Sequence, residues 1–240
     1  MRRTLVSGLI GSALLAGCVE TTSAPVSVPP RSEPVGVSQS AGRAGAMTVA
    51  DFRQVVSRVE PVAERECRTR TTGANCDFKI VVENDPSAPA NAWQTLDSAG
   101  RPVLTFTVAL IAEVQNTDEL AFVMGHEAAH HISGHIARSQ EKALTGALLG
   151  GVLIAAMGGD ANAISSAQDI GATVGARSYS KNYELEADQL GTVIAYRAGY
   201  NPVRGAEYFT RIPDPGDRFL GSHPPNAQRI ETVRRTMATL

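Results

Sequence analysis

The chain has 240 residues, of which 43% are hydrophobic, and a formal net charge of −2 at pH 7. Its 22 Lys and Arg residues nearly balance 24 Asp and Glu residues, which argues against nucleic acid as a partner. Residues 47–240 are long enough to bury a core as one domain, and no short tandem repeat is apparent.

The N-terminus has the pattern of a bacterial lipoprotein signal. Met1-Arg2-Arg3 is basic, and Leu5 to Ala16 is apolar but too short to span a bilayer permanently. Leu15-Ala16-Gly17-Cys18 resembles the lipobox, in which the Cys is lipidated and becomes the new N-terminus. The alternatives are an ordinary cleaved signal peptide or a chance Cys. We predict a signal peptide over residues 1–17, which leaves 240 − 17 = 223 residues and, without two Arg, a charge of −4.

Residues 18–46 are predicted to be the lipidated Cys and a flexible tether, because they are rich in Ser, Pro, Gly and Val. Val19 rather than Asp follows Cys18, and this resemblance favours sorting to the outer membrane. We therefore expect a lipoprotein of the bacterial envelope that faces the periplasm.

The first part of the domain reads as a helix followed by a small sheet. Apolar residues at helical spacing predict a helix from Thr48 to Glu60, with Pro61 interrupting it. Asp77 to Glu83 reads as a strand, and Trp93 to Thr107 as a hairpin that turns at Ser98 to Pro102.

Two cysteines, Cys67 and Cys76, make an even pair once Cys18 is set aside. A disulfide closing this ten-residue loop would add about 2.5–3 kcal/mol on the chain-entropy model. The alternative is two free thiols, and the spacing fits no common zinc thiolate site.

His126-Glu127-Ala128-Ala129-His130 is the most informative stretch. In a helix, His126 and His130 lie on one face and can bind one zinc ion, while Glu127 faces a water held by that ion. Asn116 and Glu119 have capping-box spacing, and Gly134 offers a stop.

Two histidines next to this pair read differently. A metzincin would place Gly and His three and six residues after His130, but Ser133 and Ile136 occupy these positions. We therefore expect His135 to be structural, bonding backbone where the helix ends. His131 should point away from the metal, as a structural or solvent-facing residue.

Ala143 to Gly159 contains seventeen residues without a charge and is rich in Gly and Ala. We favour packed helices in the domain, with close contact through Gly146 and Gly150. A surface that touches a membrane or a partner protein, and a true membrane span, are the alternatives.

Glu184 and Asp188 supply the missing carboxylates. They are four residues apart, so a helix puts both on one face. Glu184 can be the third zinc ligand, and Asp188 can accept a hydrogen bond from the outer ring nitrogen of His126 or His130. Glu186 should face elsewhere, and the alternative for the whole group is an exposed acidic helix face.

The C-terminal part is predicted to be helical. A short helix starts at Asn201-Pro202, and Ile230, Val233 and Met237 form the buried stripe of a terminal helix. Together with the sheet, this predicts an α+β class, a mostly helical zincin-like domain with a small β-sheet beside the active-site helix.

These motifs resemble the gluzincin zinc peptidases, in the branch of the CAAX prenyl endopeptidases, HtpX, the mitochondrial Oma peptidases and the periplasmic BepA and LoiP proteases. The resemblance covers Thr48 to the C-terminus and departs at no metal position. Besides the metal residues it includes these segments: Asn91-Ala92-Trp93, Asp118-Glu119-Leu120-Ala121, Gly125, His135, Ser222-His223-Pro224-Pro225 and Arg229-Ile230.

The resemblance implies a zinc endopeptidase with one Zn²⁺ per chain, which acts on misfolded or misassembled envelope proteins. Glu127 would be the general base, and His223 would be an oxyanion donor, a regulatory zinc ligand or a plain surface histidine. Arg229 would brace the His223 loop or contact substrate. The alternatives are a zinc-stabilised chaperone or assembly factor with little proteolysis, and a structural lipoprotein with an incidental metal site.

Overall fold

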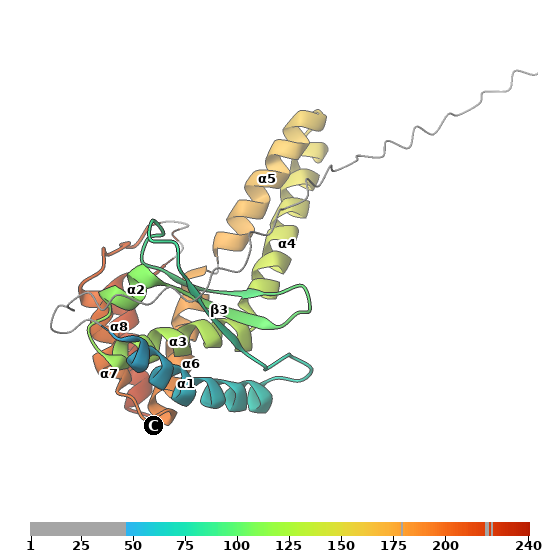
Figure 1. Ribbon diagram of the computed structural model, residues 1–240. Coiled ribbons are helices and arrows are strands. Elements are labelled where there is room, and N and C mark those ends of the chain that lie inside the picture. Colours follow the sequence, from blue (N-terminus) through green and yellow to red (C-terminus); the bar gives the residue numbers. More distant parts are fainter. Residues whose placement is uncertain (1–46, 179, 219–220, 222) are drawn as a thin grey trace, which may run out of the picture. The chain divides into compact units, whose positions relative to one another are not determined.

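Helices form most of the described chain, with a three-stranded sheet among them (Figure 1). The computed structural model describes residues 47–178, 180–218, 221 and 223–240, so the predicted signal peptide, Cys18 and tether lie outside the described residues. The elements are α1 (Val49–Arg70), β1 (Lys79–Glu83), β2 (Ala92–Leu96), β3 (Pro102–Thr107), α2 (Val108–Glu113), α3 (Thr117–Ile132), α4 (His135–Ala156), α5 (Ala161–Ser178), α6 (Ser180–Arg197), α7 (Pro202–Gly205), the 3-10 helix η1 (Ala206–Thr210) and α8 (Asn226–Met237). The predicted α+β class is confirmed.

Helix α1 begins with a capping box between Thr48 and Asp51. The prediction that Pro61 interrupts this helix is wrong, because α1 continues to Arg70. Pro61 lies on the exposed side, where water can take the carbonyl that loses its backbone partner. Val62, the next residue, is buried, and this packing stabilises the helix beyond Pro61.

The sheet has the order β1–β3–β2, with β1 parallel and β2 antiparallel to β3. Strands β2 and β3 are the predicted hairpin. The N–H of Thr107 donates to the carbonyl of Asn91. Since pairing alternates along an antiparallel ladder, the backbone groups of Ala92 and Gln94 point away from β3. Strand β2 is therefore an open edge within the described sheet.

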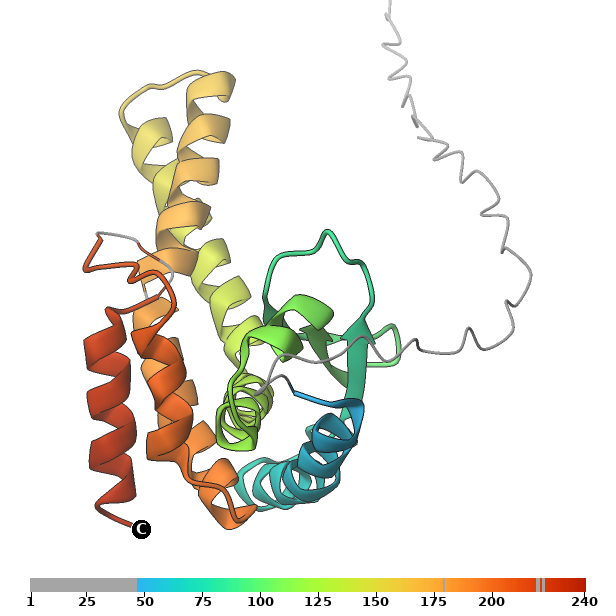
Figure 2. The ribbon, with the colours of Figure 1, turned by 60° about the vertical axis from the view of Figure 1, so that its left-hand side comes forward.

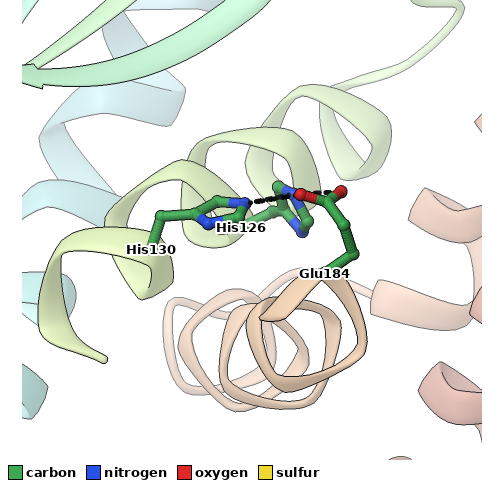
Figure 3. Close-up of side chains that lie close together, drawn as sticks. All are labelled: His126, His130 and Glu184. Carbon is green, nitrogen blue, oxygen red and sulfur yellow. Dashed lines mark hydrogen bonds and ion pairs between the residues drawn. The ribbon is translucent and has the colours of Figure 1, made fainter. Parts of the chain in front are cut away.

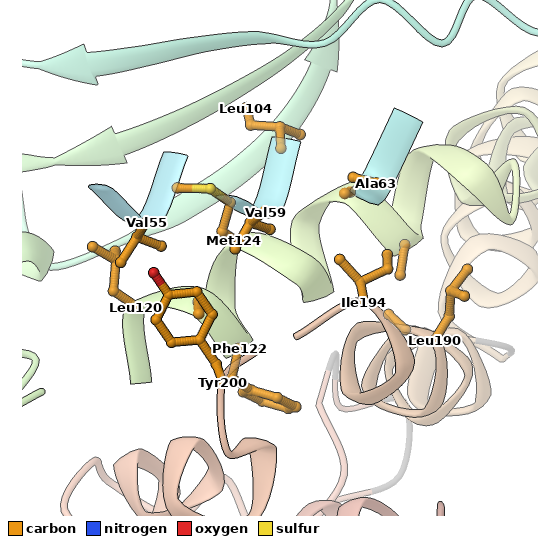
Figure 4. Packing of buried hydrophobic residues seen from close by; sticks show 14 of the residues in the cluster. Val55, Val59, Ala63, Leu104, Leu120, Phe122, Met124, Leu190, Ile194 and Tyr200 are labelled. Atoms are coloured by element: carbon orange, nitrogen blue, oxygen red, sulfur yellow. The ribbon is translucent and has the colours of Figure 1, made fainter. Parts of the chain in front are cut away.

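The core lies between α1, α3, α6 and the sheet (Figure 4). Val55 and Val59 of α1, Leu120 and Met124 of α3 and Ile194 of α6 are all at most 1% exposed. This packing holds α3 in the middle of the domain, which gives the residues on its surface fixed neighbours on several elements.

A pair of glycines brings α3 and α6 together. A Cβ atom on Gly125 would lie 2.8 Å from the carbonyl oxygen of Gly191, and one on Gly191 would lie 2.8 Å from the backbone nitrogen of His126. Only glycine allows the two backbones to approach this closely. The contact lies next to His126, so it places the histidine face of α3 against the Glu184 face of α6.

Helices α4 and α5 form a pair that extends away from the other elements (Figures 1 and 2). A Cβ on Gly146 would meet the carbonyl oxygen of Gly171 at 2.0 Å, and one on Gly150 would meet that of Ala167 at 2.3 Å. The expected contact through Gly146 and Gly150 is therefore present. Backbone packs on backbone, which directs the larger side chains outward.

The prediction that Ala143 to Gly159 packs into the domain holds only for this helix–helix contact. Among the described residues, α5 has none that is buried, and α4 has only His135 and Gly151. No described helix is both long and apolar enough to cross a bilayer.

The C-terminal segments agree with the sequence pattern. Asn201 caps α7 by accepting the backbone N–H groups of Val203 and Arg204. In α8, Val233 is fully buried and Ile230 packs against the core, whereas Met237 is only partly covered. The buried side of α8 also carries Asn226, Arg229 and Thr232.

Side-chain links hold the C-terminal end of α1. The structure contains a disulfide between Cys67 and Cys76, with 5.7 Å between their Cα atoms. Glu66 pairs with Arg70, 2.9 Å away, and with Arg197 of α6. Burial alone would raise the pKa of Glu66, but the two arginines outweigh it and hold the pKa below 4.5.

Candidate active site

Helix α3 starts where the sequence predicts. The side-chain oxygen of Asn116 accepts the backbone N–H groups of Asp118 and Glu119. The Glu119 carboxylate reaches back to the N–H of Gln115, 2.8 Å away, rather than to that of Asn116. Gly134 takes φ +65°, which ends α3 and begins α4. The helical register of the His126 and His130 pair is thereby set.

His126 and His130 of α3 and Glu184 of α6 point toward one another (Figure 3). Their nearest atoms are His126 Nε2 and His130 Nε2 at 3.0 Å, His130 Nε2 and Glu184 Oε1 at 3.3 Å, and His126 Nε2 and Glu184 Oε2 at 3.5 Å. A tetrahedral zinc ion with bonds of 2.0–2.1 Å holds its ligand atoms about 3.3 Å apart. The three residues therefore fit one zinc ion and leave its fourth position to a water or substrate.

The outer nitrogen of His126 is fixed by Asp188. His126 Nδ1 lies 2.9 Å from Asp188 Oδ1, and Asp188 is fully buried. Arg229 of α8 clamps the same carboxylate with two bonds of 2.7 and 2.8 Å and covers the ring of Phe209. Arg229 thus braces the ligand shell. Such outer partners set the tautomer and orientation of a metal-binding histidine.

The outer nitrogen of His130 is fixed by His135. The two Nδ1 atoms lie 2.8 Å apart, and His135 Nε2 lies 3.2 Å from Glu186 Oε2. Arg138 donates to Glu186 at 2.8 Å, and the ring of His135 stacks on Tyr183. The prediction that His135 bonds backbone is therefore wrong. His135 is the first residue of α4, and Tyr183 and Glu186 of α6 lie against it. The side chains of His130 and Glu186 therefore satisfy both of its nitrogens.

The pKa values of these groups follow from their partners. Burial alone would lower the pKa of His126, but hydrogen bonds to Asp188 and Glu184 raise it to about 10. Burial and the neighbouring His130 lower the pKa of His135 to about 4. Despite burial, hydrogen bonds from the histidines hold the pKa of Glu184 well below 4.5. A neutral His135 can accept a hydrogen bond from the Nδ1–H of His130.

Glu127 lies where two cavities meet. One, of about 360 Å³, is lined by Ala92 and Phe209 as well as Glu127 and Glu184. The other, of about 440 Å³, is lined by Gln94 and the same two carboxylates. Since Ala92 and Gln94 are the outward-facing positions of β2, the cavities form a cleft beside that strand. A larger hollow of about 730 Å³ near Arg70 and Thr236 contains none of the three ligand residues.

His223 lies at the rim of this cleft. Its Nδ1 is 2.9 Å from Glu184 Oε2, and its side chain is 52% exposed. The structure thus brings His126, Glu127, His130, Glu184, Asp188 and His223 together.

His131 points away, as expected, with Nε2 2.7 Å from the carbonyl oxygen of Asn75. Glu186 faces away from the ligands but supports them from outside through His135. Sequence reasoning missed this role of Glu186, and of Arg138. The only sequence signal was the presence of His135 five residues after His130. That spacing does not show which side chain of a second helix contacts His135.

Residues 50–237 match the family described as Peptidase family M48. The chain is 30% identical over 168 residues to mitochondrial metalloendopeptidase OMA1 of Saccharomyces cerevisiae, covering 66% of this chain and 46% of that protein. It is 34% identical over 123 residues to a putative beta-barrel assembly-enhancing protease of Vibrio cholerae, covering 48% and 25%. With the beta-barrel assembly-enhancing protease of Escherichia coli it shares 29% identity over 143 residues, covering 52% and 28%. The chain spans less than half the length of each of these relatives.

Proposed function

Because the chain belongs to peptidase family M48, a family of zinc metalloendopeptidases, we propose that it hydrolyses internal peptide bonds of envelope proteins. The observation that supports this most directly is the convergence of His126, His130 and Glu184 beside an open sheet edge, with Glu127 in the same cleft. His126, His130 and Glu184 would hold a zinc ion, which would lower the pKa of a bound water and polarise a carbonyl group.

Glu127 acts as general base and then as general acid. It takes a proton from the attacking water and returns it to the nitrogen of the leaving amine. Asp188 and His135 hold the two ligand rings so that both Nε2 atoms face Glu184. Arg229, buried against Asp188, keeps that carboxylate ionised and in place.

The substrate lies along β2 as an extra strand. Ala92 and Gln94 present backbone groups that no described strand pairs, and both residues line the cleft. An extended peptide that pairs with this edge would bring one of its carbonyl groups into the cleft that Glu127 lines.

His223 supplies the second donor to the developing oxyanion. This role is supported by the contact of its ring with Glu184 and by its half-exposed side chain at the rim of the cleft. Replacing His223 with Ala should lower kcat with little change in zinc content. A higher kcat would identify the other role of this residue, a ligand that silences the enzyme.

We further propose that residues 1–17 are a signal peptide, that Cys18 carries lipid, and that residues 18–46 tether domain 47–240 to the outer membrane, facing the periplasm. The relatives named for beta-barrel assembly support misfolded or misassembled envelope proteins as substrates and the envelope assembly machinery as a partner. The alternative is a zinc-stabilised chaperone or assembly factor. Glu127 favours the enzyme, because a scaffold has no use for a base at this position.

Cleavage of unfolded casein by residues 19–240 tests the proposal. We expect one zinc per chain, with cleavage lost on chelation and in Glu127→Gln while that variant still binds zinc. Zinc without cleavage in the unaltered chain would favour the chaperone. Full turnover by Glu127→Gln would refute the mechanism.

A further inference from the structure

Helices α4 and α5, with the C-cap residue Met157, carry large apolar side chains that are exposed. Their outward side chains are between 39% and 74% exposed: Leu144, Leu148, Leu149, Val152, Leu153, Met157, Ile170 and Val174. We refer to these eight residues as the apolar arm. Contiguous apolar exposure on this scale marks an interaction surface rather than scattered surface residues.

One row of the apolar arm starts in the cleft. Gln140 lines the cavity beside His130 and Glu184, together with Gln94 of the edge strand. Residues four apart are neighbours along a helix surface, so Gln140, Leu144, Leu148 and Val152 form one row, which winds about a third of a turn round α4. The row therefore leads from the site of cleavage to the exposed leucines without a break.

We propose that the apolar arm binds an apolar, extended segment of the polypeptide whose peptide bond lies in the cleft. This inference rests on the proposed function and names the kind of substrate that the site selects, unfolded chain with exposed apolar residues. From Gln140 to Val152 the helix rises about 18 Å. An extended chain covers this length with about five or six residues, so only a substrate that continues beyond the cleft reaches the arm.

The charges of this region fit a polypeptide better than a bilayer. From Ala143 to Ala176 the charged residues are Asp160 and Asp169, both acidic. Lys142 and Arg177 border this stretch, fewer than the cluster of about 4–8 cations typical of segments that bind anionic lipid. Asp160 lies between the two helices, at the end that would enter a bilayer first. The glycine face, which could receive a second pair of helices, is already used between α4 and α5.

Two variants with equal numbers of new glutamines test the arm. The first carries Leu144→Gln, Leu148→Gln and Val152→Gln, and the control carries Ala161→Gln, Ser165→Gln and Thr173→Gln, three exposed positions on a row of α5 that contains none of the eight arm residues. Glutamine keeps the helix in both. Both are made in residues 19–240, and kcat/KM is measured on unfolded casein and on a peptide of about six residues that spans only the cleft.

In the first variant, kcat/KM for casein should fall by about tenfold or more through a higher KM, while kcat/KM for the short peptide stays unchanged. In the control variant, neither value should change. An equal effect on both substrates, or none, overturns the proposal. Loss of binding to phosphatidylcholine–phosphatidylglycerol vesicles with casein kinetics unchanged would assign the arm to a membrane and also overturn it. So would dissociation of a dimer with casein kinetics unchanged.

If the unaltered chain cleaves neither substrate, the proposed function fails, and the arm is then judged by binding alone. Zinc-loaded Glu127→Gln, with and without the three arm substitutions, is titrated with fluorescent unfolded casein. A Kd raised about tenfold by the arm substitutions supports the arm, and an unchanged Kd refutes it.

Discussion

Replacing His135 with Phe should weaken zinc binding although His135 is not a ligand. When His130 binds zinc through Nε2, its Nδ1 must carry a proton, and that N–H has His135 Nδ1 as its partner at 2.8 Å. His135 is 4% exposed, so water cannot easily replace the lost acceptor. Phe keeps a flat ring to stack on Tyr183, which His135 contacts at 4.7 Å between ring centroids.

An unsatisfied buried N–H costs about 1–3 kcal/mol, which is about 5–150-fold in affinity. This agrees with the 10–100-fold typical of residues that orient metal ligands. Without zinc, His130 can move its proton to Nε2, so the penalty falls on the zinc-bound form and appears in the Kd.

Competition against a chromophoric zinc chelator measures this Kd. We expect Asp188→Asn to weaken zinc at least as much as His135→Phe, because Asp188 is fully buried and also holds Arg229. His131→Phe is the matched control, since His131 lies one residue from a ligand but bonds the carbonyl of Asn75. If His135→Phe binds zinc as tightly as the unaltered chain, the support of His130 by His135 is refuted.

Three further predictions concern stability and the helix pair. Replacing Cys67 and Cys76 with Ala should cost about 2.5–3 kcal/mol and lower Tm by about 5–10 °C, as calorimetry would show; an unchanged Tm would contradict the chain-entropy account. Because the folded pKa of Glu66 is lowered, its ion pairs stabilise the fold above the unfolded value near 4.5 and are lost as pH falls through the folded value. Glu66→Gln should therefore flatten the pH dependence of urea unfolding below about pH 4.5, and an unaltered slope there would argue against it. Gly150→Val places a side chain against the carbonyl of Ala167, where a Cβ would lie 2.3 Å away, so amide exchange in α4 and α5 should speed up; equal rates would show that the close contact is unimportant.

Features with a local cause could be predicted from the sequence. The spacing of His126, Glu127 and His130, with Asn116 before them and Gly134 after, identifies a metal helix because one helix turn fixes their relative positions. The β2–β3 hairpin likewise follows from its alternation and turn. The short helix α2 escaped prediction, although Thr107 is a good N-cap.

Features that depend on a distant partner could not be read in this way. Pro61 stays within α1 because burial on the opposite side outweighs one lost backbone bond. The leucines of α4 look like core residues in sequence, yet the glycines turn the backbone inward and leave these side chains outside. Local pattern shows which face is apolar, but it does not show what that face meets.

The sequence by itself determined which three residues could hold a metal ion and that Glu127 lies beside them, since the pitch of each helix sets which of its side chains share a face. Only the tertiary structure decided what holds those ligands. His135, which contacts Glu186, bonds the outer nitrogen of His130, and Arg229 bonds Asp188, which contacts the outer nitrogen of His126. The contact of His135 with Glu186 joins residues 51 apart on α4 and α6, and that of Arg229 with Asp188 joins residues 41 apart on α8 and α6. A packed core fixes such distances, and no spacing along one helix contains them.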